Sequence, residues 1–234
     1  MPAANTAKDS LSRRLVRLAA PVVAMNVLHV LALAIDTAMC GWLPEPEATI
    51  ALTALGFSTQ VIFLLMVGVI GLSVGAVAMV ARVYGAGQPD RVNYLITQAT
   101  QGTVLLSLLV ALVGNLVAEP MLIVLGAGEQ TLGPALAYLR PQLTLAVFFY
   151  VFVLLSGVLR GVGNTRLALE AALVHNGLNV VFNYGLILGN FGLPSLGVEG
   201  AAYGTVLAEL FGVSFLLWRL HRGALPGILA PLRP

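Results

Sequence analysis

Six long apolar segments, separated by short polar turns, run along the chain. They extend approximately over residues 18–42, 50–80, 94–117, 132–155, 167–189 and 199–218. A helix needs about 20 mostly apolar residues to cross the hydrocarbon core of a bilayer. Each segment meets this requirement, so the pattern predicts six membrane-spanning helices.

The connectors between these segments are short and rich in proline and glycine, which is typical of turns. They lie near residues 44–46, 85–89, 126–128, 161–164 and 189–194. None is long enough to hold a soluble domain. The predicted fold is therefore an all-α membrane protein, a single bundle of six transmembrane helices.

Two segments also carry small residues four positions apart, at Gly71 and Gly75 and again at Gly157 and Gly161. Such spacing lets two helices approach closely. We expect these glycines to support tight packing inside the bundle, with a dimer face as the alternative.

Composition strengthens the membrane assignment. The chain has 234 residues, 59% hydrophobic and only 9% charged, whereas soluble domains carry about 25% charged residues. The net charge of +2 comes from scattered basic residues, which excludes nucleic acid as an expected partner. A single cysteine, Cys40, excludes an intrachain disulfide, and Cys/His metal spacing is absent.

Basic residues are distributed unevenly between the two sets of predicted loops. Eleven of the twelve Lys and Arg residues fall on the side of the two termini, and only Arg140 falls on the other. Cytoplasmic loops of membrane proteins carry an excess of Lys and Arg. We therefore expect a multi-pass protein of the cytoplasmic (inner) membrane with both termini in the cytoplasm.

Asp36 is a carboxylate inside an otherwise apolar span, and an ionisable group at that depth is by default a functional candidate. At a rise of 1.5 Å per residue, Asp36, Asn183 and Thr205 each lie about 9 Å from the outer ends of their helices. Asn179 shares a helix face with Asn183 and lies about one turn deeper. These four side chains therefore have a common depth at which they can meet.

Carboxylate, amide and hydroxyl oxygens suit a hard monovalent cation, and the carboxylate can alternatively carry a proton. We expect Asp36, Asn179, Asn183 and Thr205 to form a cation site of this kind, and no other metal site or cofactor. Two structural alternatives stay open. Asp36 can extend toward the interface, and the asparagines can serve as hydrogen-bonding contacts between helices.

Three further polar residues lie inside predicted spans: His29, His175 and Glu209. His175 belongs to the same polar stripe as Asn179 and Asn183, together with Asn176. We expect these three residues to be contacts to a substrate or secondary polar groups, with helix packing as the alternative.

Five motifs that follow one another along the chain resemble those of a known family. Pro21 stands fifteen residues before Asp36, and Gly71-Leu-Ser-Val-Gly-Ala-Val-Ala-Met-Val-Ala-Arg-Val-Tyr-Gly-Ala-Gly87 closes the second span. Leu159-Arg-Gly-Val-Gly-Asn-Thr-Arg166, Leu178-Asn-Val-Val-Phe-Asn-Tyr-Gly-Leu-Ile187 and Phe191-Gly-Leu-Pro-Ser-Leu-Gly-Val-Glu-Gly-Ala-Ala202 follow. From about residue 18 to 222, the chain resembles the N-terminal lobe of multidrug and toxic compound extrusion (MATE) transporters.

The resemblance implies export of organic, often cationic, compounds in exchange for Na⁺ or H⁺ by alternating access between two six-helix lobes. It places Asp36 as the cation-coupling carboxylate and Asn179, Asn183 and Thr205 as its partners. Pro21 becomes the point at which the first helix bends. Some members carry Asp at the position of Asn183, so the identity of the ion stays open.

The resemblance also implies a domain layout and a missing half. Residues 1–17 are expected to be a cytoplasmic segment, 18–222 the transmembrane lobe, and 223–234 the start of a cytoplasmic connector between lobes. The expected partners are the bilayer, small organic cations, and a second six-helix lobe that is either a separate chain or another copy.

The alternatives to this function are a flippase, a chain without transport activity and an enzyme. A flippase for lipid-linked precursors would need cationic groups in its cavity, because its cargo is anionic, and the spans offer almost none. A truncated chain without activity, or a structural membrane protein, is the remaining alternative. An enzyme is not expected, because no Ser/His or His/Glu motif has workable spacing on any span.

Overall fold

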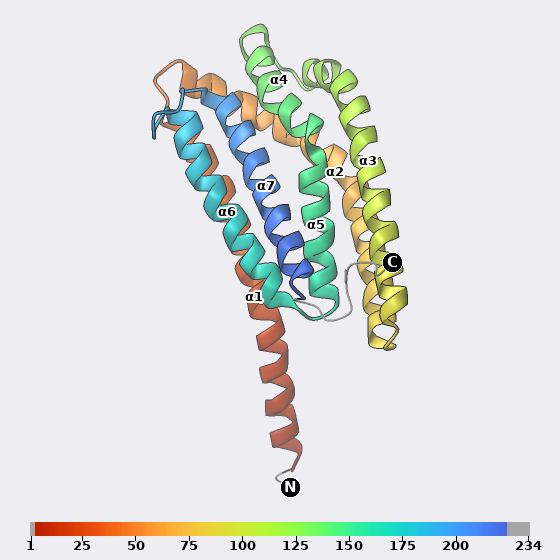
Figure 1. Cartoon of the computed structure of the whole chain (residues 1–234). Coiled ribbons are helices and arrows are strands. Elements are labelled where there is room, and N and C mark those ends of the chain that lie inside the picture. The colour runs from red at the N-terminus through yellow and green to blue at the C-terminus, as the bar shows by residue number, and fades with distance from the viewer. Residues whose placement is uncertain (1–2, 224–234) are drawn as a thin grey trace.

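The computed structural model describes residues 3–223, which form seven α-helices and short connectors. The helices are α1 (Ala3–Gly41), α2 (Glu47–Gly85), α3 (Pro89–Val124), α4 (Glu129–Thr144), α5 (Ala146–Gly161), α6 (Thr165–Leu188) and α7 (Gly197–His221). They run up and down beside one another (Figure 1). Five are long and apolar enough to cross a membrane, and α4 with α5 makes up to six spans.

The fourth predicted span, residues 132–155, differs from the expectation of one continuous helix. It consists of α4 and α5, which meet at Leu145 with a bend of 56°. Leu145 adopts φ −106° and ψ 19°, outside the helical region. Pro141, one turn earlier, cannot donate a backbone hydrogen bond, and proline is a common cause of such bends. The hydropathy pattern shows the length of an apolar segment but not the direction of its helix axis. Hydropathy alone therefore could not indicate the bend.

The first helix is longer than its apolar segment. α1 begins at Ala3 and includes most of residues 1–17, which we predicted as a separate cytoplasmic segment. Its first turns extend beyond the other helices (Figure 1). Pro21 lies inside α1 without ending the helix. Of the predicted connector 223–234, residues 224–234 lie outside the described part of the chain.

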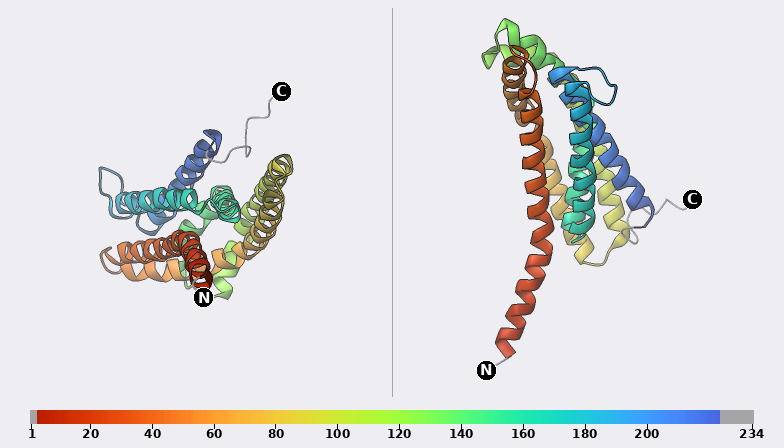
Figure 2. Two further views of the ribbon diagram at one scale, coloured as in Figure 1. Left: turned by 90° about the horizontal axis from the view of Figure 1, so that it is seen from below. Right: turned by 90° about the vertical axis from the view of Figure 1, so that its left-hand side faces the viewer.

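The helices pack as neighbours in space rather than only in sequence. α6 packs most extensively against α7, and α1 lies along α6, while α2 contacts α3, α4 and α5. Figure 2, seen from below, shows α1 and α2 side by side across from α6 and α7. Fully buried apolar side chains form separate clusters in the interior: Leu154 and Leu216 belong to one, and Leu139 belongs to another among α2, α3, α4 and α5.

The two predicted small-residue motifs behave differently. A Cβ at Gly157 or Gly161 would lie 2.9 or 2.8 Å from a methyl carbon of Val77, so these glycines do permit close packing of α5 on α2. A Cβ at Gly71 or Gly75 would have no heavy atom within 4 Å among the described residues. The expectation of tight packing inside the bundle is therefore wrong for Gly71 and Gly75.

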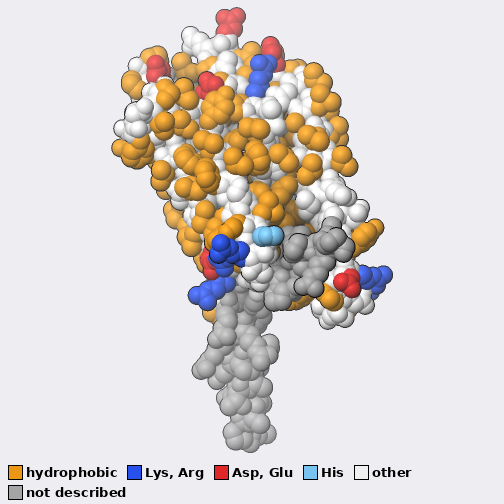
Figure 3. Space-filling model, in the orientation of Figure 1, with side chains coloured by type: hydrophobic (Ala, Val, Ile, Leu, Met, Phe, Trp, Pro, Cys, Tyr) orange, Lys and Arg blue, Asp and Glu red, His pale blue; other side chains and the backbone are white. Residues whose placement is uncertain are grey.

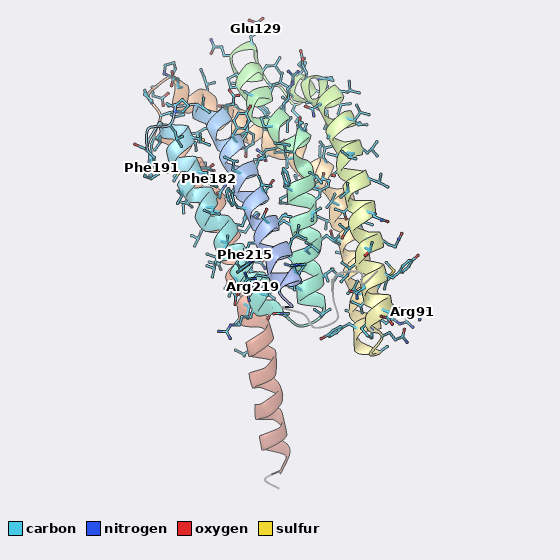
Figure 4. All side chains as sticks on the ribbon, viewed as in Figure 1. Arg91, Glu129, Phe182, Phe191, Phe215 and Arg219 are labelled. Atoms are coloured by element: carbon cyan, nitrogen blue, oxygen red, sulfur yellow. The ribbon has the colours of Figure 1, made fainter. Side chains whose placement is uncertain are left out.

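The outer surface is apolar between two polar ends. Hydrophobic side chains cover the face in Figure 3, and charged ones gather at its two ends. Glu129 lies at one end of the bundle, and Arg91 and Arg219 lie at the other (Figure 4). Such a band of exposed apolar side chains suits lipid contact. This is a multi-pass membrane protein.

Two buried serines on α2 provide a test of the packing. Ser58 Oγ donates a 3.0 Å hydrogen bond to the Ala135 carbonyl oxygen on α4, whereas Ser73 Oγ is buried without a partner among the described residues. We expect Ser58→Ala to destabilise the purified chain by about 1 kcal/mol, because the bond is lost. Ser73→Ala should be neutral or stabilising. Thermal unfolding in detergent measures both, and equal melting temperatures would contradict the prediction.

Candidate cation site

A cavity of about 260 Å³ lies among α1, α2, α4, α5, α6 and α7. One wall is apolar and aromatic and the other is polar. The residues around it are His29, Ala32, Leu33, Asp36, Thr59, Ile62, Phe63, Met66, Tyr138, Gln142, Phe149, His175, Asn176, Asn179, Thr205 and Glu209. Most of the polar side chains that the sequence singled out therefore face one space, which no single helix could form.

Asp36 is held at the polar wall by α6. Asn183 Nδ2 donates a 2.7 Å hydrogen bond to Asp36 Oδ1, joining residues 147 positions apart in sequence. Asp36 is partly buried, and Asn183 is fully buried. A hydrogen bond to a charged acceptor is stronger than one between neutral groups. The carboxylate thus points into the bundle rather than toward the interface, which was the alternative.

Asn179 extends this network in either of two amide orientations. In one, its Nδ2 donates to Thr205 Oγ1 at 3.2 Å. In the other, its Nδ2 donates to both Asp36 oxygens at 3.1 and 3.2 Å, and its oxygen accepts from Asn183 Nδ2 and Thr205 Oγ1 at 3.2 Å each. The second orientation satisfies more partners. Asp36, Asn179, Asn183 and Thr205 form one cluster in both.

Gly204 makes this cluster possible, and the sequence analysis did not identify it. A Cβ at Gly204 would overlap the Asn183 side-chain oxygen, and a Cβ at Gly200 would overlap the Leu186 carbonyl oxygen. Glycine at both positions lets α7 approach α6 closely enough for Thr205 to reach Asn179. The sequence does carry a signal for this approach, because Gly200 and Gly204 have the same four-residue spacing as Gly157 and Gly161.

The remaining predicted residues fall in three places. Glu209 and His175 line the same cavity deeper in the bundle, and His29 lines it from α1. Pro21 lies outside the cavity, further along α1. Tyr138 and Gln142 on α4 also line it, and the sequence analysis missed both. Tyrosine and glutamine in a short amphipathic segment give no distinctive signal.

The chemistry of the cluster is that of oxygen ligands. Within residues 3–223, no group of three or more His, Cys, Asp or Glu side chains could hold a metal ion. Asp36 supplies two oxygens, and Asn179, Asn183 and Thr205 supply one each. Rotating an amide by half a turn exchanges an N–H group that faces the carboxylate for an oxygen that could face a cation beside it.

A comparison with known protein families decides the assignment. The family model MatE matches residues 21–185, which include Asp36, Asn179 and Asn183. This chain belongs to the MatE family. The match covers the whole cluster except Thr205.

Curated MatE-type relatives are about twice as long. A probable multidrug resistance protein NorM of Thermotoga maritima is 29% identical over 210 residues, covering 90% of this chain and 44% of that protein. A probable multidrug resistance protein YoeA of Bacillus subtilis is 26% identical over 204 residues, covering 87% and 43%. The chain thus spans about half the length of the curated relatives it matches. Both relatives are named as probable multidrug resistance proteins.

Solved structures show the same fold. An outward-facing MATE family transporter of the MOP superfamily matches with a TM-score of 0.82 at 24% identity, covering 94% of this chain and 48% of that one. A MATE structure in a bent conformation matches with a TM-score of 0.82 at 22% identity, covering 95% and 49%. One in a straight conformation has a TM-score of 0.82 at 23% identity and covers 94% and 47%.

The close approach at Gly204 yields a second prediction. Gly204→Ala forces α7 away from α6, because the new methyl group overlaps Asn183, and we expect destabilisation by about 1–3 kcal/mol. Gly177→Ala on α6 is the matched control, since a Cβ there would have no heavy atom within 4 Å among the described residues. Thermal unfolding of both variants in detergent measures the difference. A Gly204→Ala variant as stable as the control would contradict the packing described for α6 and α7.

Proposed function

We propose that the chain is one lobe of a cation-coupled antiporter that exports organic cations across the cytoplasmic membrane. The observation that carries the proposal is the position of Asp36, a carboxylate partly buried at a cavity between helices and held by the Asn183 amide at 2.7 Å. Membership in the MatE family and relatives described as multidrug resistance proteins support the same class of function.

In this proposal, Asp36 alternates between a cation-free and a cation-bound form. Without a cation, the Asn183 amide N–H stabilises the charged carboxylate, and the Asn179 amide can add its own. When Na⁺ enters, rotation of either amide turns an oxygen toward the ion, and Thr205 offers a hydroxyl oxygen beside them. When H⁺ binds, Asp36 becomes a neutral acid and no longer needs hydrogen bonds from both amides. Either ion changes the hydrogen bonds that join α1 to α6.

Pro21 gives α1 a place to bend when these bonds change. Proline inside a helix removes one backbone hydrogen bond, so its helix tolerates two packings at low cost. The similarity to solved MATE structures in both bent and straight conformations supports exchange between two states. We propose that cation loading at Asp36 shifts the balance between them.

The charge of the cavity favours a cationic cargo. Asp36 and Glu209 line it, and among the described residues no Lys or Arg does. An anionic lipid-linked pyrophosphate would meet two carboxylates and no basic partner, which argues against a flippase for such precursors. Aromatic side chains of Phe63, Tyr138 and Phe149 on the same cavity suit an organic cation.

Orientation and assembly complete the proposal. Arg82, Arg91, Arg160 and Arg166 flank the two loops at the end of the bundle that also holds the end of α7, so we place that end in the cytoplasm. The curated relatives are about twice as long, so a second six-helix lobe completes the central cavity. We propose that this lobe is a separate chain, a second copy of this chain or a further part of the same protein.

Removing the charge of Asp36 tests the coupling role. We expect cells that express the chain together with its second lobe to export ethidium, and Asp36→Asn to reduce that efflux at least tenfold, because a neutral amide takes up no proton and offers no negative charge to Na⁺. Asp90→Asn, at an exposed position in the first turn of α3 and outside the cavity, is the control and should retain efflux. Ethidium fluorescence in a strain lacking its own exporters measures both. Equal efflux by the two variants would exclude Asp36 from coupling.

The coupling ion is tested separately in the same cells. We expect efflux to fall to the Asp36→Asn level when sodium is replaced by choline and the proton gradient is collapsed together. Applying each change alone then identifies the ion that drives transport. Efflux that continues without either gradient would show that the chain does not couple transport to Na⁺ or H⁺.

A further inference from the structure

A second layer of polar side chains lies one helical turn deeper than the Asp36 cluster. Three helices each contribute two polar residues to this cavity, four positions apart in sequence. The outer member of each pair lies nearer the depth of Asp36, and the inner member lies deeper in the bundle. These pairs, outer member first, are Asn179 and His175 on α6, Thr205 and Glu209 on α7, and Tyr138 and Gln142 on α4. Four residues of helix correspond to about 6 Å.

Asn176 follows His175 on α6 and lines the same cavity, so it is counted with this inner layer. Several atoms of the layer are buried without a hydrogen-bond partner among the described residues. They are Asn176 Oδ1, His175 Nε2 and Gln142 Nε2. Asn176 is only 8% exposed, and its Nδ2 is already used by the Ala172 carbonyl at 2.7 Å, so its free oxygen remains for another partner. Buried polar groups in proteins are nearly always paired. Such atoms around one cavity leave hydrogen-bonding capacity for a bound ion or for water.

Glu209 is the charged member of the inner layer. Its side chain is 6% exposed. The salt bridges within the described residues join Arg140 to Glu119 and Arg219 to Glu170, and neither involves Glu209. No hydrogen bond of its carboxylate occurs there either. A buried, isolated charge is costly unless it is paired. Glu209 therefore needs a cation that the described residues do not provide.

The groups around Glu209 cannot supply a fixed positive charge. His175 faces the cavity from α6, Tyr138 from α4 and Phe149 from α5, while α1 contributes His29 and Asp36. Tyr150 of α5 lines a smaller adjoining cavity that Glu209 also reaches, and α2 contributes only uncharged side chains to either. The histidines are outside ion-pair distance, and Asp36 is itself an acid. The neutralising cation must come from solution.

We propose that Glu209 and the free oxygen of Asn176 form a second site for a monovalent inorganic cation, H⁺ or Na⁺, one helical turn inward from Asp36. H⁺ and Na⁺ both meet the requirement of this site, because each is a small ion with one positive charge that neutralises the Glu209 carboxylate. The inference extends the cation coupling proposed above, and it is tested at Glu209 independently of Asp36. It gives this lobe two cation sites in one cavity instead of one.

The test uses the full chain in lipid nanodiscs with four variants. Glu209→Gln and Asp36→Asn remove one carboxyl group each, the double variant removes both, and Glu129→Gln at an exposed position is the control. Infrared difference spectra across a pH range report protonated carboxyl groups through their C=O stretching band. Binding of radioactive sodium reports Na⁺. Circular dichroism and gel filtration show whether each variant is folded.

We expect Glu209→Gln to remove one signal that Asp36→Asn leaves in place. For H⁺, that signal is a carboxyl C=O band, and for Na⁺ it is about half of the bound sodium. The double variant should lose both signals, and Glu129→Gln neither. Glu209→Asp keeps the carboxyl group but shortens the side chain, so it should shift the band or weaken sodium binding. This variant replaces Glu209→Gln if the latter does not fold.

The proposal is overturned if Glu209 variants leave both the infrared spectrum and sodium binding as in the native chain. A signal that is lost with Glu209→Gln but also with Asp36→Asn would reduce the two sites to one shared site and would equally overturn it. Retention of the Glu209 signal with no signal from Asp36 would instead reject the proposed coupling residue and leave the second site standing.

Discussion

The hydrogen bond between Asp36 and Asn183 is the contact on which the arrangement of the lobe depends. A carboxylate among apolar helices is tolerated only where donors compensate its charge. The donor comes from α6, so α1 must lie along α6 with this face inward. The 2.7 Å bond fixes both the depth and the rotation of the two helices at that point. α7 must then approach α6 closely, and Gly204 leaves the room for the Asn183 side chain.

The bend at Leu145 has a consequence for the cavity. A straight helix through residues 129–161 could follow only one line through the bundle. The 56° bend gives α4 and α5 different directions, and both reach the cavity, α4 with Tyr138 and Gln142 and α5 with Phe149. The broken span thus adds polar and aromatic groups opposite α6 and α7.

The sequence predicted the number of spans and the four residues of the outer cluster, because both follow from simple spacing. Apolar length determines a span, and the rise per residue places Asp36, Asn183 and Thr205 at one depth. Apolar length does not show the bend at Leu145, for which Pro141 is the signal in the sequence. The part played by Tyr138 could not be predicted, since it depends on direction in space.

The glycines also show what spacing in the sequence cannot predict. Gly71 and Gly75 have the spacing of a packing motif but face open space, whereas Gly200 and Gly204 have it and are packed. Spacing indicates that two helices can approach, but only the neighbouring helix decides whether they do. A motif of this kind is therefore informative when a partner side chain such as Asn183 is known, and not before.

The charge balance of the cavity leads to a requirement for exchange. It holds two carboxylates and, among the described residues, no Lys or Arg. Such a cavity is electrically neutral only when cations occupy it. In the proposed function, the coupling ion and the organic cation compete for the same negative charges, so loading one favours release of the other. Export in exchange for Na⁺ or H⁺ then follows from electrostatics, and two carboxylates at different depths let a small ion and a larger cargo displace each other in steps.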